Sequence, residues 1–462
     1  MPHEKPTPLQ PIVAEEFDQL IDPFGPFESD PRVAVGVSGG ADSLCLALLL
    51  NFWLRRHHGR VVALIVDHGL RREAKQEIKQ LAKWLTDYKI EHHVLVWGDQ
   101  KPRKRGQAAA RDARYHLLTG WCRGAGVLHL ALAHHRDDQV ETLLLRKDRG
   151  SGSDGMASMP IVWEQDNVRL LRPLLSVPGE RLRATLRSWD QCWVEDPSND
   201  DPAFGRTHVR RKLAQLPQRR QEVAHIANMA SEYAAARAEA DEATAVMLSQ
   251  ATQIDPAGFC WLDHRLFLEA PASVGVRGLM QIILAVGGNK YGPSRDSLLL
   301  LYETLRKNQL TGGRTLGGCY IAPFGRVILL CREPCASDHV LGILPGQCLV
   351  WDHRFQVTLL GRHSSSRHKF MVGRLGENGW CTVKRESVGT NERKLPLFVR
   401  YSLPALWDLD GLVAVPHLNY RGGAYVGGTD PGFAARFRPR RAFAGPAFRG
   451  VDSVDLGGSN FR

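Results

Sequence analysis

The chain has 462 residues, of which 43% are hydrophobic and 24% are charged. At about 150 residues per domain, this length predicts roughly three domains. The composition is typical of a folded protein and argues against a mostly disordered chain. No run reaches the roughly 18 apolar residues of a membrane helix. The start, MPHEKPTPLQPIVAEEF, lacks the apolar segment of a secretory signal. We therefore expect a cytoplasmic protein that does not contact membranes.

The charge balance indicates a class of partner. The chain has 60 Lys and Arg residues and 49 Asp and Glu residues, which gives a net charge of +11. Such a charge suits a polyanion, because phosphate contacts release counterions, although charge alone fits an ordinary basic protein equally well. The nine cysteines form no CxxC motif, and the close pair Cys331 and Cys335 has no second pair to complete a zinc site. The pattern predicts reduced thiols.

The first half of the chain alternates between strand-like and helix-like segments. Residues 1–30 are proline-rich and are predicted to be an arm. Short apolar runs follow, separated by helical stretches, and this pattern predicts a Rossmann-like parallel sheet covered by helices on both faces. In such sheets ligands bind at the carboxyl ends of the strands. The predicted strands are 33–37, 61–66, 92–97 and 127–133, with a further strand and helix within 169–189.

The second half has a different pattern. Residues 218–250 are rich in Ala, Glu and Arg and predict one long helix, and further helix within 272–308 ends in a glycine-rich hairpin near 311–330. After Pro334 apolar and polar residues alternate, which predicts a small β-rich domain at about 337–425. The end of the chain is basic and rich in Gly, Pro and Phe, and the sequence leaves its order open.

A glycine-bearing loop, SGGADS, follows the first predicted strand and opens the next helix. Its glycines let the backbone approach an anion, and its serines and the N–H groups of the first helical turn can bind phosphate oxygens. Asp42 would repel a phosphate unless a cation lay between them, so we expect it to bind Mg²⁺ carried by a nucleotide. A simple helix cap after a glycine turn is the alternative. The loop is neither GxxxxGK[ST] nor GxGxxG, which disfavours Walker-type and dinucleotide enzymes. The predicted nucleotide-binding residues of the loop are Ser38, Gly39, Gly40, Ala41, Asp42 and Ser43.

This loop resembles the PP-loop of the N-type ATP pyrophosphatases. With VDHGLR (66–71), HHRDDQVET (134–142), RGSG (149–152), RPLL (172–175) and EDPSN (195–199), the chain resembles the tRNA(Ile)-lysidine synthases over about residues 31–215. The resemblance implies that ATP and Mg²⁺ are used to attach free L-lysine to C2 of the wobble cytidine of an isoleucine tRNA with a CAU anticodon. Together with the changes in composition along the chain, it predicts a division into an arm (1–30), a PP-loop domain (31–215), a helical tRNA-binding domain (216–336), a small C-terminal domain (337–425) and a basic tail (426–462).

Two acids and two histidines follow the fourth predicted strand. Asp138 and Glu141 are three residues apart, so they face the same way near a helix start, where the helix dipole tolerates carboxylates. The resemblance implies that they clamp the amino groups of lysine. His134 and His135 lie where active-site loops belong and are expected to contact nucleotide or base, although a structural role fits either one equally well.

Paired arginines and a second strand end complete the predicted site. Arg111 and Arg114 share one helix face, and two guanidinium groups suit phosphate recognition and charge stabilisation during phosphoryl transfer. A salt-bridged surface pair is the alternative. Asp67 and His68 follow the second predicted strand, where they could line an adenosine pocket or make only a turn before Gly69.

Three basic runs predict contact with the tRNA backbone. The first contains Lys101, Arg103, Lys104 and Arg105; the second contains Arg206, Arg210, Arg211 and Lys212, close to Arg219 and Arg220; the third contains Arg436, Arg438, Arg440 and Arg441. Any single run is more often a solvated face, but three in a chain of this charge favour RNA.

Other functions remain to be weighed at this point. A tRNA thiolase of the PP-loop class is disfavoured because no CxxC motif is present, and asparagine or GMP synthesis would need a glutaminase domain with an N-terminal cysteine. A non-catalytic, ATP-gated RNA-binding protein is disfavoured by the presence of Asp42, Asp138 and Glu141. The sequence allows a homodimer and does not decide the oligomeric state.

Overall fold

The computed structural model describes residues 10–67, 74–97, 107–165, 167–195, 205–334, 339–360, 369–386, 395–422 and 432–451. The chain divides into two compact units. The first comprises Met1–Glu239 together with Phe448–Arg462, and the second comprises Ala240–Ala447. The first unit is thus made from both ends of the chain.

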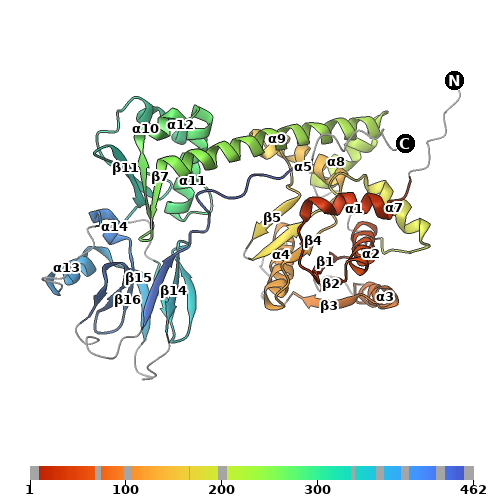
Figure 1. Ribbon diagram of the computed structural model, residues 1–462, viewed down its shortest axis with the longest axis horizontal. Coiled ribbons are helices and arrows are strands. Elements are labelled where there is room, and N and C mark those ends of the chain that lie inside the picture. The colour runs from red at the N-terminus through yellow and green to blue at the C-terminus, as the bar shows by residue number, and fades with distance from the viewer. Residues whose placement is uncertain are drawn as a thin grey trace. The chain divides into compact units, whose positions relative to one another are not determined.

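A six-stranded sheet organises the first unit, with strand order β3-β2-β1-β4-β6-β5 (Figure 1). All neighbouring strands are parallel except β5, which pairs antiparallel with β6 at one edge. The predicted α/β fold with a parallel sheet is confirmed. The strands are β1 (Arg32–Val37), β2 (Arg60–Asp67), β3 (Glu91–Val96), β4 (His129–Ala131), β5 (Val162–Gln165) and β6 (Val168–Leu171).

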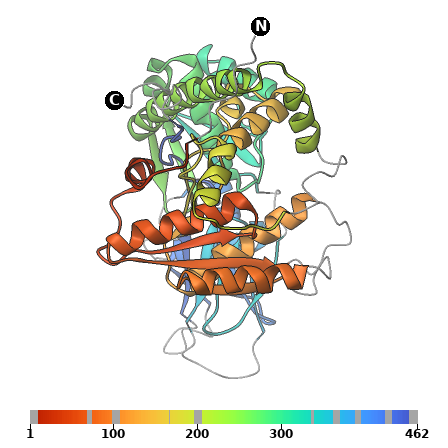
Figure 2. The same cartoon turned by 90° about the vertical axis from the view of Figure 1, so that its right-hand side faces the viewer.

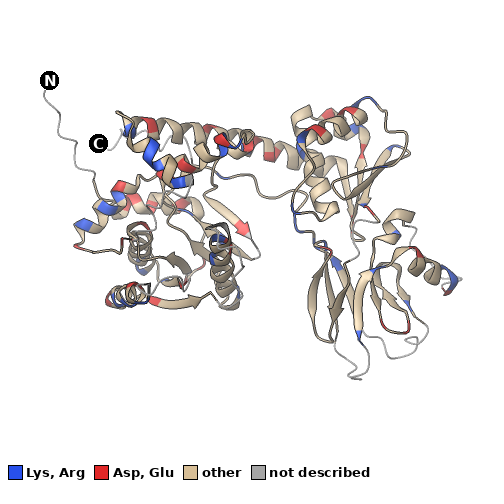
Figure 3. Cartoon of the chain, turned by 180° about the vertical axis from the view of Figure 1, so that it is seen from behind, with Lys and Arg blue, Asp and Glu red and all other residues tan. Residues whose placement is uncertain are grey.

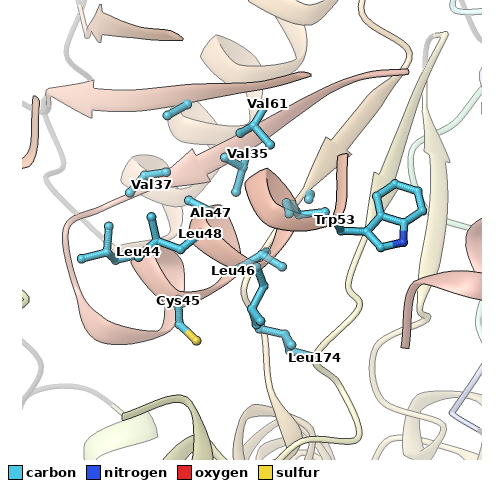
Figure 4. Close-up of a cluster of buried hydrophobic side chains, with 14 of the residues drawn as sticks. Val35, Val37, Leu44, Cys45, Leu46, Ala47, Leu48, Trp53, Val61 and Leu174 are labelled. Carbon is cyan, nitrogen blue, oxygen red and sulfur yellow. The ribbon is translucent and has the colours of Figure 1, made fainter. Parts of the chain in front are cut away.

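Helices cover both faces of this sheet because successive strand residues point to opposite sides. In β1, Val33 and Val35 pack with α2 (Ala41–Arg56), while Ala34 between them packs with α4 (Gln107–Gly124). Figure 4 shows the core on the α2 side, where Leu44 and Leu48 meet the valines of β1. Figure 2 turns this face toward the viewer. Also present are α3 (Ala74–Asp87), α5 (Arg136–Asp148), α6 (Ser153–Met156), α7 (Gly179–Ser188) and α8 (Gly205–Ala214).

A packed helix, α1 (Ala14–Ile21), lies within the segment that the sequence predicts to be an arm. Phe17 and Ile21 lie on one face, four residues apart, and both are buried in the α2-side core. The Arg181 guanidinium adds a two-pronged ion pair with Glu16, at 2.6 Å for each contact. The N-terminal segment is therefore part of the first unit's core.

The predicted long helix is α9 (Arg219–Ala251). The second unit continues with a five-stranded antiparallel sheet of order β7-β8-β11-β10-β9, packed against three helices. The glycine-rich hairpin lies where the sequence predicts it, and β7 and β8 lie between the two predicted helical stretches, where no element was predicted. The elements are β7 (Thr252–Asp255), β8 (Phe259–Asp263), α10 (His264–Glu269), α11 (Ala272–Gly287), α12 (Arg295–Arg306), β9 (Arg314–Leu316), β10 (Cys319–Phe324) and β11 (Val327–Arg332).

The remainder of the second unit is β-rich, as predicted for 337–425. One sheet has the order β12-β15-β16-β17-β18, and another has the order β13-β14-β19. The last strand falls in the predicted basic tail and pairs with β14 along its whole length. No helix in the described ranges is long and apolar enough to cross a membrane. The elements are β12 (Leu341–Ile343), β13 (Cys348–Trp351), β14 (Phe355–Leu359), β15 (Phe370–Arg374), α13 (Gly376–Glu386), α14 (Leu397–Tyr401), β16 (Pro404–Trp407), β17 (Leu412–Val415), β18 (Tyr420–Arg421) and β19 (Phe433–Phe437).

Candidate active site

The loop between β1 and α2 is a tight, internally bonded bend at the carboxyl end of β1. The Ser38 N–H donates to Ser43 Oγ at 3.1 Å, and Ser43 Oγ donates to the Gly40 carbonyl at 3.1 Å. Gly39 has φ +89°, a conformation that glycine adopts without strain. The first turn of α2 follows directly, so its unpaired backbone N–H groups lie beside the bend, which is the arrangement that binds phosphate oxygens.

The Asp42 carboxylate lies between this bend and the start of α5. Its Oδ2 is 3.4 Å from His135 Nε2, and its side chain is 33% exposed. Its Oδ1 is buried and has no hydrogen-bond partner among the described residues. A buried carboxyl oxygen without a partner suits a cation that arrives with the nucleotide, because Mg²⁺ in phosphate sites is held by one or two carboxylates and the phosphates themselves. The residues present fit Mg²⁺ in that role.

Two adjacent histidines connect β4 to α5 and have opposite electrostatics. Burial, reinforced by Arg172 and Arg111, lowers the pKa of His134 to about 3, and its Nδ1 has no partner among the described residues. Burial also acts to lower the pKa of His135, but the carboxylates of Asp138 and Asp42 outweigh it and raise that pKa to about 9. At neutral pH the site therefore holds a neutral imidazole next to a cationic one.

His134 predicts a pH dependence of stability. Its pKa is lower in the folded protein than the ordinary 6.5, so the unfolded chain binds one more proton between these values, and stability falls as the pH drops below 6.5. Between pH 6 and 5, the free energy of unfolding of the wild type is expected to fall by about 1.4 kcal/mol per pH unit relative to that of His134→Gln. Urea unfolding at several pH values measures this. The control His208→Gln, at an exposed position on α8, should keep the wild-type slope.

The two predicted acids lie on α5 and face basic residues of α8. Asp138 Oδ2 accepts the His135 N–H at 3.1 Å, and its Oδ1 is 3.9 Å from Arg206 and 3.8 Å from Arg210. Burial raises the pKa of Glu141, which accepts two hydrogen bonds from Arg210 at 2.5 and 3.3 Å. The Asp138 carboxyl is also buried, yet the neighbouring His135 lowers its pKa to about 2. Arg206 and Arg210 therefore face the acids of this site.

This pairing changes what a charge reversal at Arg210 should do. Arg210→Glu places a third carboxylate beside Glu141 and Asp138. We expect the free energy of unfolding to fall by about 2–3 kcal/mol. This is less than the 3–5 kcal/mol lost when a fully buried ion pair is broken, because Arg210 is 43% exposed. Thermal unfolding measures this loss. The exposed Lys212→Glu on the same helix is the control, and equal melting temperatures for the two variants would contradict the pairing.

The predicted arginine pair lies on α4 next to the same acids and histidines. Arg111 donates to Tyr115 Oη at 3.3 Å, and its guanidinium carbon lies 5.2 Å from the centre of that ring. Burial lowers the pKa of Arg114, which interacts electrostatically with Arg206 and Asp138. The surface salt bridge considered from the sequence is not seen here among the described residues. The two guanidiniums instead add positive charge at the carboxyl edge of the sheet.

The roles predicted for Asp67, His68 and the other basic residues stay predictions. Asp67 ends β2, and its carbonyl accepts the Trp97 N–H at 3.0 Å. His68 and the run Lys101–Arg105 are outside the described residues. Arg211 is exposed on α8. Arg219 and Arg220, at the start of α9, form ion pairs with Glu180 on α7. Figure 3 shows that basic and acidic residues alternate on the helices of the first unit. Of the third basic run, Arg436 and Arg438 lie on β19 or just after it, and Arg440 and Arg441 follow, all in the second unit.

Two side chains beside the site were not predicted from the sequence. Arg172 is 4% exposed, donates to the Pro160 carbonyl at 2.8 Å, and hydrogen-bonds to Tyr115. Its segment, RPLL, carries the family resemblance, but nothing in the letters shows that this arginine is buried beside His134. Gln139 is also buried, and its side-chain amide pairs with both backbone polar groups of Met159.

Comparison with known proteins agrees with this geometry. Residues 9–217 match the family model described as a PP-loop domain. This class of protein binds ATP at a loop of the kind found between β1 and α2. The match begins before α1, in agreement with the packing of that helix into the core.

Curated relatives narrow the class. The tRNA(Ile)-lysidine synthase of Wolbachia sp. subsp. Brugia malayi is 30% identical over 87% of this chain and 92% of its own. That of Ruegeria pomeroyi is 36% identical over 71% of this chain and 77% of its own. A solved U34-tRNA thiolase, NcsA from Methanococcus maripaludis, matches 47% of this chain and 77% of its own at 18% identity and a TM-score of 0.40. The chain belongs to the tRNA(Ile)-lysidine synthase family of PP-loop proteins.

Proposed function

We propose that this protein is an ATP-dependent ligase that joins the ε-amine of free L-lysine to C2 of the wobble cytidine of an isoleucine tRNA with a CAU anticodon. The observation that supports it most is the meeting of the PP-loop, Asp42 and the acids of α5 at one edge of the sheet, in a chain of this family. A reaction that consumes ATP, an amine and RNA needs anion-binding, cation-binding and basic surfaces together.

The first step is adenylation of the base. ATP binds with its phosphates on the Ser38–Ser43 loop, where Asp42 would hold an accompanying Mg²⁺ that would offset the phosphate charge. The C2 oxygen of cytidine attacks the α-phosphorus, and pyrophosphate leaves. Arg111 and Arg114 lie where they could balance charge that develops on the phosphates. Adenylation is needed because a carbonyl oxygen does not depart from C2, whereas AMP does.

The second step is attack of lysine on C2 with loss of AMP. The ε-amine must first give up a proton, since its ordinary pKa is near 10.4, and a carboxylate of the site or a phosphate oxygen accepts that proton. Asp138 stays ionised at neutral pH and supplies negative charge for an ammonium group of the substrate. Glu141 lies on the same face of α5 as Asp138, and Arg210 of α8 orients its carboxylate. We propose that the exposed basic residues of the first unit, including Arg211 on α8, contact the tRNA backbone.

A lysine-incorporation assay tests the proposal. Protein, ATP, radiolabelled lysine and isoleucine tRNA with a CAU anticodon are mixed, with methionine tRNA of the same anticodon letters as the matched control. Label in the isoleucine tRNA alone is the expected result. Sulfur incorporation from a sulfur donor would favour a thiolase, and tRNA binding without pyrophosphate release would favour a non-catalytic binding protein. Failure of a folded preparation to incorporate lysine rejects the proposal.

A further inference from the structure

The last described residues of the chain return to the first unit and pack against it (Figure 1, dark blue). Phe448 is 9% exposed and shares a hydrophobic cluster with Ala157 and Ala234. The Arg237 guanidinium carbon lies 4.3 Å from the centre of the Phe448 ring, within the range of a cation–π contact. We call residues 448–451 the C-terminal strap.

Two polar contacts and one close packing contact fix the position of the strap on three separate parts of the unit. The Arg449 carbonyl accepts the Ile161 N–H at 2.8 Å, and its guanidinium donates to the Pro23 carbonyl at 2.5 Å. Gly450 sits directly on α9, where a Cβ would come within 2.3 Å of the Ala234 Cβ. The strap therefore joins the N-terminal segment, the segment after α6 and the long helix, with no space for a side chain at residue 450.

A short chain of contacts leads from the strap to the acids of the site. The segment from Ala157 to Ile161, which the strap covers, holds Gln139 through hydrogen bonds of 2.8 and 2.9 Å to the Met159 backbone. Ser158 Oγ donates to the Gln139 carbonyl at 3.2 Å. Val451 and Gln139 line the same small cavity. Gln139 is the residue next to Asp138 on α5.

We propose that the C-terminal strap is a positioning element for α5. By holding the segment after α6 against α9, it fixes Gln139 and thereby the placement of Asp138 and Glu141 at the site. This inference rests on the proposed function for its catalytic consequence. The strap does not contact the Ser38–Ser43 loop in the described part of the chain, so nucleotide binding should not depend on it.

Steric complementarity at Gly450 provides a specific test. Gly450→Ala introduces a Cβ that collides with Ala234, and Ala234→Gly removes the atom that it meets. Gly445→Ala is the matched control, because a Cβ there meets nothing within 4 Å. The four variants (each single change and the Ala234→Gly/Gly450→Ala pair) are made in the full-length chain. The measurements are lysine incorporation, ATP affinity by calorimetry and amide hydrogen exchange across residues 136–148.

Gly450→Ala is expected to lower kcat for lysine incorporation roughly tenfold. This is a smaller loss than the ~10²-fold that follows from misplacing a reacting group by 1 Å. The ATP affinity should stay within twofold of wild type. Exchange in α5 should quicken while that in α2 stays unchanged. The double variant should return to within twofold of Ala234→Gly alone. Wild-type kcat and exchange in Gly450→Ala, or no rescue in the double variant, would overturn the inference. If the wild type itself incorporates no lysine, the proposed function fails, and the exchange rates alone decide whether the strap holds α5.

Discussion

Asp42→Asn is expected to abolish pyrophosphate release while leaving the fold intact. The buried Oδ1 of Asp42 has no partner among the described residues, so asparagine of nearly equal size replaces it without breaking a hydrogen bond at that atom. What is lost is the charge that would hold Mg²⁺, together with one of the carboxylates that keep His135 protonated; Asp138 remains beside that histidine. Metal stabilisation of phosphoryl charge is worth several kcal/mol, which corresponds to a loss of at least about 10³-fold in rate. Release of pyrophosphate from ATP in the presence of tRNA and lysine measures it.

Asp112→Asn is the matched control for this change. Asp112 lies exposed on α4 in the same unit, and its carboxylate is outside the site. The control should retain wild-type turnover, and both variants should melt within a few degrees of wild type. An Asp42→Asn variant with near-wild-type turnover would show that the carboxylate has no part in ATP chemistry, and the assignment of the loop's metal role would fall.

Asp352→Asn is expected to destabilise the second unit strongly. Asp352 is 4% exposed and accepts one hydrogen bond from Arg332 and one from Arg354, each at 2.8 Å. Arg354 is fully buried and also donates to two backbone carbonyls. Asparagine tolerates the φ of +50° at this position, so the substitution removes the charge and spares the backbone. Two buried guanidiniums without a counter-ion should cost about 3–5 kcal/mol.

Urea unfolding followed through the second unit's transition measures this loss. Asp410→Asn is the control, because Asp410 is exposed in the same unit. It should shift the midpoint little. A change below 1 kcal/mol in Asp352→Asn would mean that backbone carbonyls, including that of Gly287 at the end of α11, satisfy the two arginines without the carboxylate.

The strands and helices of the first unit could be predicted because their signals are local. The valines and alanines of β1 alternate between two covered faces, and the glycines of the SGGADS loop mark the bend after it. The helix α1 was missed because its two core residues, Phe17 and Ile21, make too short an apolar pattern. The strands β7 and β8 are short and pair with each other, and β8 joins the rest of its sheet only through β11, about 70 residues further along the chain.

For the site, the sequence predicted which residue types gather but not how they pair. Motifs placed Asp138 and Glu141 on one helix face, and the structure has them there. Arg210 was assigned to tRNA because it lies in a basic run, yet its guanidinium faces Glu141 from another helix. Glu141 and Arg210 are 69 positions apart in the chain, so their pairing depends on how α5 and α8 pack. A run of charged residues in the sequence does not reveal that packing. The domain boundaries and the roles of the site residues stay predictions.

The most direct test of the account is to identify the products of ATP. The bend at Ser38–Ser43 is proposed to present the α-phosphorus to the cytidine oxygen, so ATP labelled at its α-phosphate should yield labelled AMP, one per lysine incorporated, with pyrophosphate as the other product. Formation of ADP and inorganic phosphate in step with lysine incorporation would contradict it.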